Sequence, residues 1–264
     1  MIDWTDEQLE RYSRHILLPE VGGIGQEKLL EAAVLVVGAG GLGAPMLQYL
    51  AAAGVGRIGV IDGDTVDLSN LQRQVIHRSR DVGVSKAESA ARMIGDLNPD
   101  VRVDVYRERL TAANALEVLA PYAIVADGTD NFATRYLLND ACHLAGKTLV
   151  SGALLRFEGQ LSTFKSHQGT GHPCYRCLFP EPPAPGTVPS CSEAGVFGAV
   201  AGAVGVQQAV EVLKEILGIG ESLSGRFLMY DGLYTEWRNI KLRKNPACPL
   251  CGEQPTIRDL SLHA

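Results

Sequence analysis

A buried strand that runs into a glycine motif and then into a helix constrains the fold of this chain most strongly. In "AVLVVGAGGLG", residues 33–43, an apolar run precedes glycines at positions 38, 40 and 43, and "APMLQYLAAAGV" continues with a helical pattern. Glycines at this spacing allow a tight turn and bring the free N–H groups of a helix N-terminus close to phosphate. Asp62 ends the next strand, where its carboxylate can accept hydrogen bonds from ribose hydroxyls. The motif therefore predicts a nucleotide site rather than a purely structural turn.

The order of the expected strands and helices predicts an α/β fold. Strand patterns at 57–62, 101–106, 123–130 and 147–154 alternate with helical segments, which is typical of a parallel sheet covered on both faces. After about Ser151 the pattern changes, because residues 157–164 alternate like an antiparallel strand and residues 226–242 resemble a hairpin about Asp231-Gly232. We predict a Rossmann-like, mostly parallel sheet that is continued by antiparallel strands.

We expect one domain over residues 1–264, made of four parts. Helices occupy residues 1–30, a nucleotide-binding half spans 31–150, and an antiparallel half spans 151–252. The stretch 180–192 is dense in proline, so it predicts an extended loop without regular structure.

Composition argues against nucleic-acid binding and membrane insertion. The net charge of −6 is unlike the concentrated Lys and Arg that bind phosphate backbones. The start, "MIDWTDEQLERYSRH", lacks the apolar core of a signal peptide, and the uncharged run 194–210 is shorter than the roughly 18 residues of a membrane span. We therefore expect a cytoplasmic location, where cysteines serve as metal ligands or reactive thiols more often than as disulfides.

Polar side chains after the expected strands indicate which nucleotide binds. Asn70, Arg73 and Lys86 follow the second strand, and Asp130 and Asn131 follow a later one. Two cations and a carboxylate suit a triphosphate with Mg²⁺, because the cations offset charge on the transferring phosphorus and the carboxylate holds the metal. From the residues alone, a solvated polar loop and an ordinary NAD site both remain open.

A set of motifs then gives a resemblance that extends from about residue 7 to residue 252. The chain resembles the MoeB/ThiF family, bacterial relatives of ubiquitin-activating enzymes, in the stretches "RYSRHILLPEVG", "GAGGLG", "DGDTVDLSNLQRQVIH", "VGVSKAESA", "DGTDNFATRYLLND" and "CSEAGVFG". Such enzymes adenylate the C-terminus of a small ubiquitin-like sulfur-carrier protein. The resemblance thus implies that the half 151–252 binds the carrier and that 180–192 is a crossover loop.

The resemblance also implies roles for individual residues. It places catalysis on Arg14, Arg73, Lys86 and Asp130, with Asp130 as the Mg²⁺ ligand. Arg14 matches an arginine that reaches into the neighbouring subunit's site, which implies a homodimer. The positions implied to contact ATP are Gly41, Asp62, Ser69, Asn70, Leu71, Gln72, Arg73, Lys86, Asp130 and Asn131.

The implied reaction is attack by the carrier's C-terminal glycine carboxylate on the α-phosphorus of ATP, which yields an acyl-adenylate and pyrophosphate. The carrier ends in Gly-Gly, and its sulfur is expected from a separate donor such as a cysteine desulfurase or a rhodanese. The full N-terminal segment and the paired cysteines favour the small subunit of molybdopterin synthase as the carrier. The thiamine-pathway carrier is the alternative, and a relative that acts on a modified tRNA nucleoside is a third.

Two functions from other classes compete with adenylation. An NAD-dependent oxidoreductase would leave Arg73, Lys86 and Arg14 without a role. A non-catalytic zinc-stabilised binding module would show gaps among the ATP positions, and the sequence shows none.

Two C-x₂-C pairs, Cys174/Cys177 and Cys248/Cys251, predict a structural Zn²⁺ site. Redox pairs are the alternative, but they lack a thioredoxin-like context. His172 is interpreted as a bystander, since four thiolates complete the site. Two further cysteines carry different predictions. Cys191, at the end of the proline-rich loop, is a candidate for a covalent bond to the carrier or a plain loop residue, and Cys142 is expected to be a small buried hydrophobe.

Overall fold

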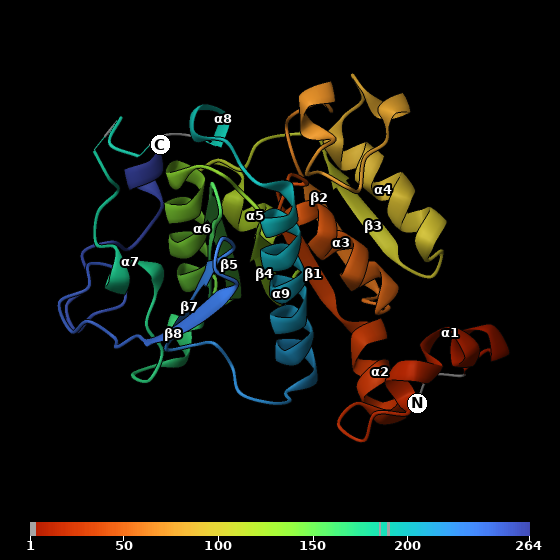
Figure 1. The fold of residues 1–264 in the computed structure, drawn as a ribbon. Coiled ribbons are helices and arrows are strands. Elements are labelled where there is room, and N and C mark those ends of the chain that lie inside the picture. The colour runs from red at the N-terminus through yellow and green to blue at the C-terminus, as the bar shows by residue number, and fades with distance from the viewer. Residues whose placement is uncertain (1–3, 185, 189–190) are drawn as a thin grey trace.

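The computed structural model describes residues 4–184, 186–188 and 191–264, and within them the strands form one eight-stranded sheet in the order β3-β2-β1-β4-β5-β6-β7-β8 (Figure 1). Neighbours among the first five strands run parallel, and the pairs from β5 to β8 run antiparallel. The predicted fold class is confirmed. The strands are β1 Ala33–Val37, β2 Arg57–Ile61, β3 Arg102–Tyr106, β4 Ile124–Asp127, β5 Thr148–Leu155, β6 Glu158–Phe164, β7 Arg226–Asp231 and β8 Glu236–Lys241.

Helices cover both faces of the parallel strands because successive side chains of a strand point to opposite faces. In β1, Val34 and Val36 join one core with helices α3 (Gly43–Ala52), α4 (Lys86–Leu97) and α9 (Gly198–Leu217). Leu35 and Val37 join a second core with α5 (Ala115–Leu119) and α6 (Phe132–Leu144). The connections leave the carboxyl ends of β1, β2 and β4 on one edge of the sheet, which is where such folds bind ligands.

The N-terminal helices α1 (Asp6–Ile16) and α2 (Gly22–Glu31) lie at the opposite edge of the sheet. Thr5 and Gln8 form a capping box at the start of α1. The buried Asn98 amide donates to the Tyr12 hydroxyl (2.9 Å) and to the carbonyl of Ala51 (2.8 Å). These bonds fix α1 to the C-terminal ends of α3 and α4, far from the helix N-termini that face the ligand edge.

The antiparallel half shares β5 with the nucleotide-binding half, so the expected boundary at 150/151 falls inside a strand. The predicted hairpin about Asp231-Gly232 is confirmed, and its loop is Gly232–Thr235, since Asp231 pairs with Glu236. The Asp231 carboxylate accepts from the backbone N–H groups of Leu233 and Tyr234, which favours this loop.

The expected helix within residues 194–210 begins and ends later than the uncharged run. It is α9, and it ends at Gly218 in a left-handed conformation that favours glycine. Two short helices precede it, α7 (Tyr175–Leu178) and α8 (Cys191–Ala194). None of the helices in the described part of the chain is long and apolar enough to cross a membrane.

Candidate active site

The glycine loop between β1 and α3 adopts the tight turn that its sequence predicts. Gly38 has φ of 91°, a value that L side chains rarely adopt, and a Cβ on Gly43 would overlap the carbonyl oxygen of Gly38. The N–H of Ala39 donates to the Asp62 carboxylate at 2.9 Å. The first strand's loop and the second strand's acidic residue are therefore held against each other, as a nucleotide cradle requires.

A buried histidine anchors the same loop, and sequence reasoning missed it. His77 Nε2 lies 3.0 Å from the carbonyl oxygen of Ala39, and Nδ1 lies 2.9 Å from Ser89 Oγ on α4. Ser89 in turn contacts the Asp81 carboxylate at 2.9 Å. Burial lowers the pKa of His77. The only sequence signal was a histidine at the end of a polar loop, and its contacts are non-local.

A cavity of about 780 Å³ opens in front of the glycine loop. Six of the ten residues expected to contact ATP line it, and they are Gly41, Asp62, Arg73, Lys86, Asp130 and Asn131. The other four, Ser69, Asn70, Leu71 and Gln72, do not line the cavity. Ser69 and Asn70 lie in the adjoining 3₁₀ turn, which the side chains of Asp67 and Asn70 cap reciprocally, and Leu71 and Gln72 follow this turn.

Several of the side chains that line this cavity are cationic. Lys86 Nζ lies 3.4 Å from Asp64 Oδ2, and the Arg109 guanidinium lies 3.0 Å from Asp64 Oδ1. Burial alone would raise the pKa of Asp64, but the two cations outweigh burial and hold this pKa below its ordinary value. Arg73 donates to the carbonyl of Ser69 at 3.1 Å. Arg109 was not predicted, since it follows a different strand, β3.

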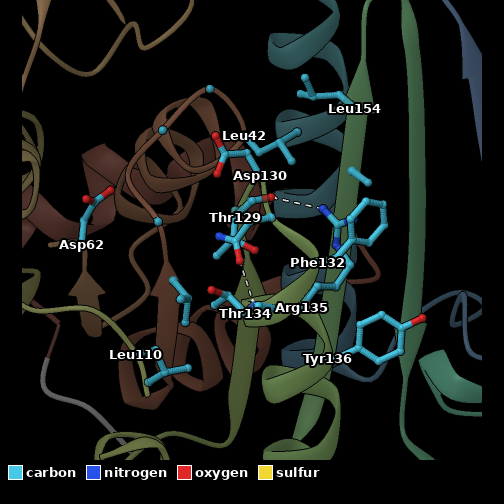
Figure 2. Close-up of a pocket in the computed structure, with 18 of the residues that line it drawn as sticks. Leu42, Asp62, Leu110, Thr129, Asp130, Phe132, Thr134, Arg135, Tyr136 and Leu154 are labelled. Atoms are coloured by element: carbon cyan, nitrogen blue, oxygen red, sulfur yellow. Dashed lines mark hydrogen bonds between the residues drawn. The ribbon is translucent and has the colours of Figure 1, made fainter. Parts of the chain in front are cut away.

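A buried ion pair shapes the turn that carries Asp130. The fully buried Asp127 carboxylate accepts from Thr129 Oγ1 (2.6 Å) and Ser151 Oγ (2.8 Å), and it lies 3.5 Å from Arg135 Nε. Arg135 also donates to the carbonyl of Thr129, as the dashed line in Figure 2 marks. The turn is therefore rigid up to Thr129, and the next residue, Asp130, is exposed on the cavity.

Asn131 begins α6 as its N-cap. Its Oδ1 accepts from the backbone N–H of Thr134 at 2.9 Å. Within the described residues no side-chain hydrogen bond engages the Asp130 carboxylate, which leaves it available to a ligand or a cation.

Arg14 does not reach the cavity of its own chain. It is an exposed residue of α1, and α1 lies at the amino-terminal edge of the parallel strands. Leu17, just after α1, and Ile24 in α2 are 71% and 76% exposed. A role for Arg14 in this kind of site therefore requires a second copy of the chain.

The four cysteines of the two C-x₂-C pairs come together although some 70 residues separate them. The ligand atoms of Cys174, Cys177, Cys248 and Cys251 all lie within 4.8 Å of one another. Sulfur–sulfur distances of 3.4–4.0 Å are close to the ~3.8 Å that follows from tetrahedral Zn–S bonds of about 2.3 Å. The residues fit a tetrahedral metal ion.

The other cysteines and His172 are placed as follows. Cys142 is buried in α6, as expected, and burial raises the pKa of its thiol. His172 contacts Ser224 Oγ at 2.8 Å and is not part of the cysteine cluster. Cys191 begins α8, but its side chain lies outside the described part of the structure, so its covalent role stays a prediction.

A glycine loop and an acidic residue at the carboxyl edge of a parallel sheet define a nucleotide-binding protein of the Rossmann-like class. The profile of the ThiF family matches residues 12–250, and the sulfur carrier protein adenylyltransferase of Thermus thermophilus is 56% identical over 97% of this chain and 96% of its own length. The chain therefore belongs to the ThiF family and is an adenylyltransferase of that family.

Other relatives are longer or more distant. The adenylyltransferase and sulfurtransferase MOCS3 of Bos taurus is 53% identical, and the match covers 96% of this chain but 55% of MOCS3. A crystal structure of E. coli MccB superposes with a TM-score of 0.81 over 92% of this chain and 74% of MccB, at 22% identity. At that identity the MccB match shows the fold alone.

Proposed function

We propose that this protein uses ATP to adenylate the C-terminal glycine carboxylate of a small ubiquitin-like sulfur-carrier protein, with release of pyrophosphate. The observation that carries the proposal is one cavity that joins a phosphate-binding glycine loop to Arg73, Lys86 and Asp130. The name of the Thermus thermophilus relative supports the class of substrate. An NAD-dependent oxidoreductase, which the glycine motif also allows, is not favoured by any of these relatives.

The chain's own residues would act by positioning and by charge. The glycine loop and the N-terminus of α3 offer backbone N–H groups to the phosphates, and Asp62 accepts from the ribose. Arg73 and Lys86 would stabilise the charge that grows on phosphate oxygens while the carboxylate attacks the α-phosphorus. The reaction needs no covalent enzyme intermediate, because bound reactants gain most from correct orientation.

Two metal ions belong to the proposal. Asp130 would hold Mg²⁺, which supplies charge neutralisation at the pyrophosphate leaving group, and its exposed carboxylate on the cavity wall fits that role. Zn²⁺ would bind the four cysteines without an open coordination position, so it would be structural.

The carrier itself is proposed to be the small subunit of molybdopterin synthase, with the thiamine-pathway carrier as the alternative. The test is ATP–pyrophosphate exchange with each purified carrier and wild-type protein. We expect the molybdopterin-synthase subunit to support exchange at least about tenfold faster than the thiamine carrier, and a carrier without its C-terminal glycine to support none. Faster exchange with the thiamine carrier would reverse the assignment, and exchange with neither carrier would contradict the proposed function.

A homodimer with Arg14 acting across the interface completes the proposal. It rests on the distance of α1 from its own cavity and on the exposed apolar residues Leu17 and Ile24 of the N-terminal segment. The sulfur would come from a separate donor, such as a cysteine desulfurase or a rhodanese.

Mixing two inactive variants tests the dimer. Arg14→Ala and Arg73→Ala should each be inactive, yet re-associated mixtures should recover about a quarter of wild-type exchange. In such a mixture, half of the dimers contain one chain of each variant. In each of these mixed dimers one of the two sites has both Arg73 and the other chain's Arg14. Recovery near zero in mixtures shown to contain mixed dimers would contradict the action of Arg14 across the interface.

A further inference from the structure

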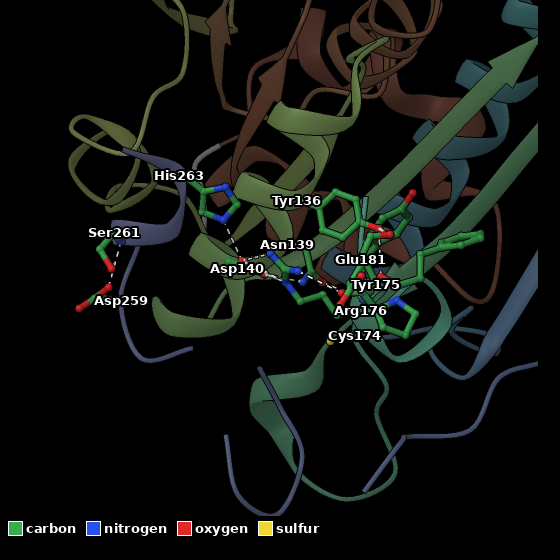
Figure 3. A network of polar contacts seen from close by, with 12 residues as sticks. Tyr136, Asn139, Asp140, Cys174, Tyr175, Arg176, Glu181, Asp259, Ser261 and His263 are labelled. Atoms are coloured by element: carbon green, nitrogen blue, oxygen red, sulfur yellow. Dashed lines mark hydrogen bonds and ion pairs between the residues drawn. The ribbon is translucent and has the colours of Figure 1, made fainter. Parts of the chain in front are cut away.

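A buried polar network joins the cysteine cluster to α6 and to the first residues of the proline-rich segment (Figure 3). Arg176 lies in α7, between the cluster residues Cys174 and Cys177. Its guanidinium donates two hydrogen bonds to the Asp140 carboxylate of α6, from Nε to Oδ1 at 2.8 Å and from Nη2 to Oδ2 at 2.7 Å. This is the bidentate geometry in which arginine–carboxylate pairs are strongest.

The Asp140 carboxylate has two further partners, so the buried charge is fully satisfied. The Asn139 amide donates to Oδ1 at 2.9 Å, and His263 Nε2 lies 2.8 Å from Oδ2. The side chains of Arg176 and Asp140 are 4% and 0% exposed. Burial alone would lower the pKa of Arg176, but the hydrogen bonds to Asp140 outweigh it and the pKa is raised.

Arg176 and Tyr136 of this network also contact three consecutive backbone carbonyls where the proline-rich segment begins. Arg176 Nη1 donates to the carbonyl of Pro180 at 3.2 Å. The Tyr136 hydroxyl lies 3.0 Å from the carbonyl oxygen of Phe179 and 2.7 Å from that of Glu181. Burial raises the pKa of Tyr136 to about 12, so the hydroxyl keeps its proton and remains a donor at neutral pH.

Two of these three carbonyls belong to residues that line the cavity, Phe179 and Glu181. Pro183 and Val188 of the same segment also line it, and these four residues form one wall. A proline-dense segment has few N–H groups with which to make its own ladder, so external contacts decide where it lies. Ala153–Leu155 of β5, in the half expected to bind the carrier, line the same cavity.

We propose that Arg176 and Tyr136 are positioning residues, which hold the start of the proline-rich segment against the cavity and so couple this wall of the cavity to the cysteine cluster. The inference rests on the proposed function for its substrate. The cysteine cluster would thus act beyond local stability, because Arg176 lies in the short helix α7, which contains Cys177 and has Cys174 as its N-cap.

Tyr136→Phe is the sharpest test, since it removes one hydroxyl and keeps the ring, whose centroid lies 5.1 Å from that of the Tyr175 ring. We expect the KM for the carrier to rise about tenfold, as for the loss of one good hydrogen bond, with the KM for ATP and kcat changed less than about twofold. Metal content should be unchanged. Tyr106→Phe is the matched control, because its hydroxyl contacts Tyr122 away from the cavity.

A second readout does not depend on adenylation. The N–H of Phe179 donates to the carbonyl of Tyr175, and the N–H of Thr187 donates to that of Ala184. Deuterium should replace these two amide hydrogens about tenfold faster in Tyr136→Phe than in wild type, below the temperature of unfolding. Arg176→Lys keeps the charge beside Asp140 but cannot form two parallel hydrogen bonds with it, so deuterium uptake should also be faster in that variant. Stripping the metal with a chelator should have the same effect.

Deuterium uptake at the wild-type rate in Tyr136→Phe would overturn the proposal. So would an equal rise in the KM for ATP and the KM for the carrier, which a general distortion of the cavity would produce. If wild-type protein shows no ATP–pyrophosphate exchange with any carrier, the proposed function fails, while the deuterium uptake still decides whether the network positions the segment.

Discussion

Arg73→Ala is expected to lower ATP–pyrophosphate exchange by about 10²–10³-fold, equivalent to roughly 3–4 kcal/mol of transition-state stabilisation. Arg73 lines the cavity, is half-buried and makes one hydrogen bond within the described residues, from Nη1 to the carbonyl of Ser69. Its charge is therefore available to the phosphates rather than committed to a carboxylate. The fold should not depend on it.

The control for this prediction is Arg102→Ala. Arg102 is equally charged and 71% exposed, and it lies on β3 outside the cavity. Exchange in this control should stay within about twofold of wild type, and both variants should unfold at the wild-type denaturant midpoint. Near-normal exchange in Arg73→Ala would remove Arg73 from the proposed machinery and leave Lys86 and Arg109 to offset the phosphate charge.

Cys248→Ser is expected to destabilise the protein by about 3–5 kcal/mol and to reduce bound zinc from one ion per chain to a small fraction of that value. The metal would join residues 174–177 to residues 248–251, and the β7–β8 hairpin lies between these two segments in the sequence. Losing it should free the C-terminal segment, including Leu260, which packs in the core of α6. Zinc content and urea unfolding are the measurements.

Cys142→Ala is the matched control for the loss of a cysteine. It removes a buried thiol from α6 without touching the cluster, so zinc content should be unchanged and the cost in stability should be about 1 kcal/mol. A Cys248→Ser protein that retains full zinc and wild-type stability would contradict the metal assignment.

The features that the sequence predicted best are those that depend on consecutive residues. The strand, glycine turn and helix at 33–55 depend on local conformation, and Gly38 and Gly43 occupy places where a side chain would be strained or would clash. The antiparallel continuation and the β7–β8 hairpin followed from period-two patterns, whereas the structure alone gave the hydrogen bonds of Asp231 that hold the loop.

Residues that act through distant partners were not visible in the sequence. Arg109, His77 and Arg135 join the site from separate elements, and their residue types are equally common on solvated surfaces. The ion pair of Asp140 with Arg176 spans 36 positions, and the contact of His263 spans 123. No local pattern marks such pairs.

By itself, therefore, the sequence determined the nucleotide cradle and the four-thiol set, because turn geometry and ligand chemistry restrict the residues that can serve. Only the tertiary structure decided which charges face the cavity, that Arg14 lies away from it, and that Tyr136 and Arg176 hold the start of the proline-rich segment. These choices depend on how helices pack across the two faces of the sheet, which brings together residues that no spacing along the chain connects.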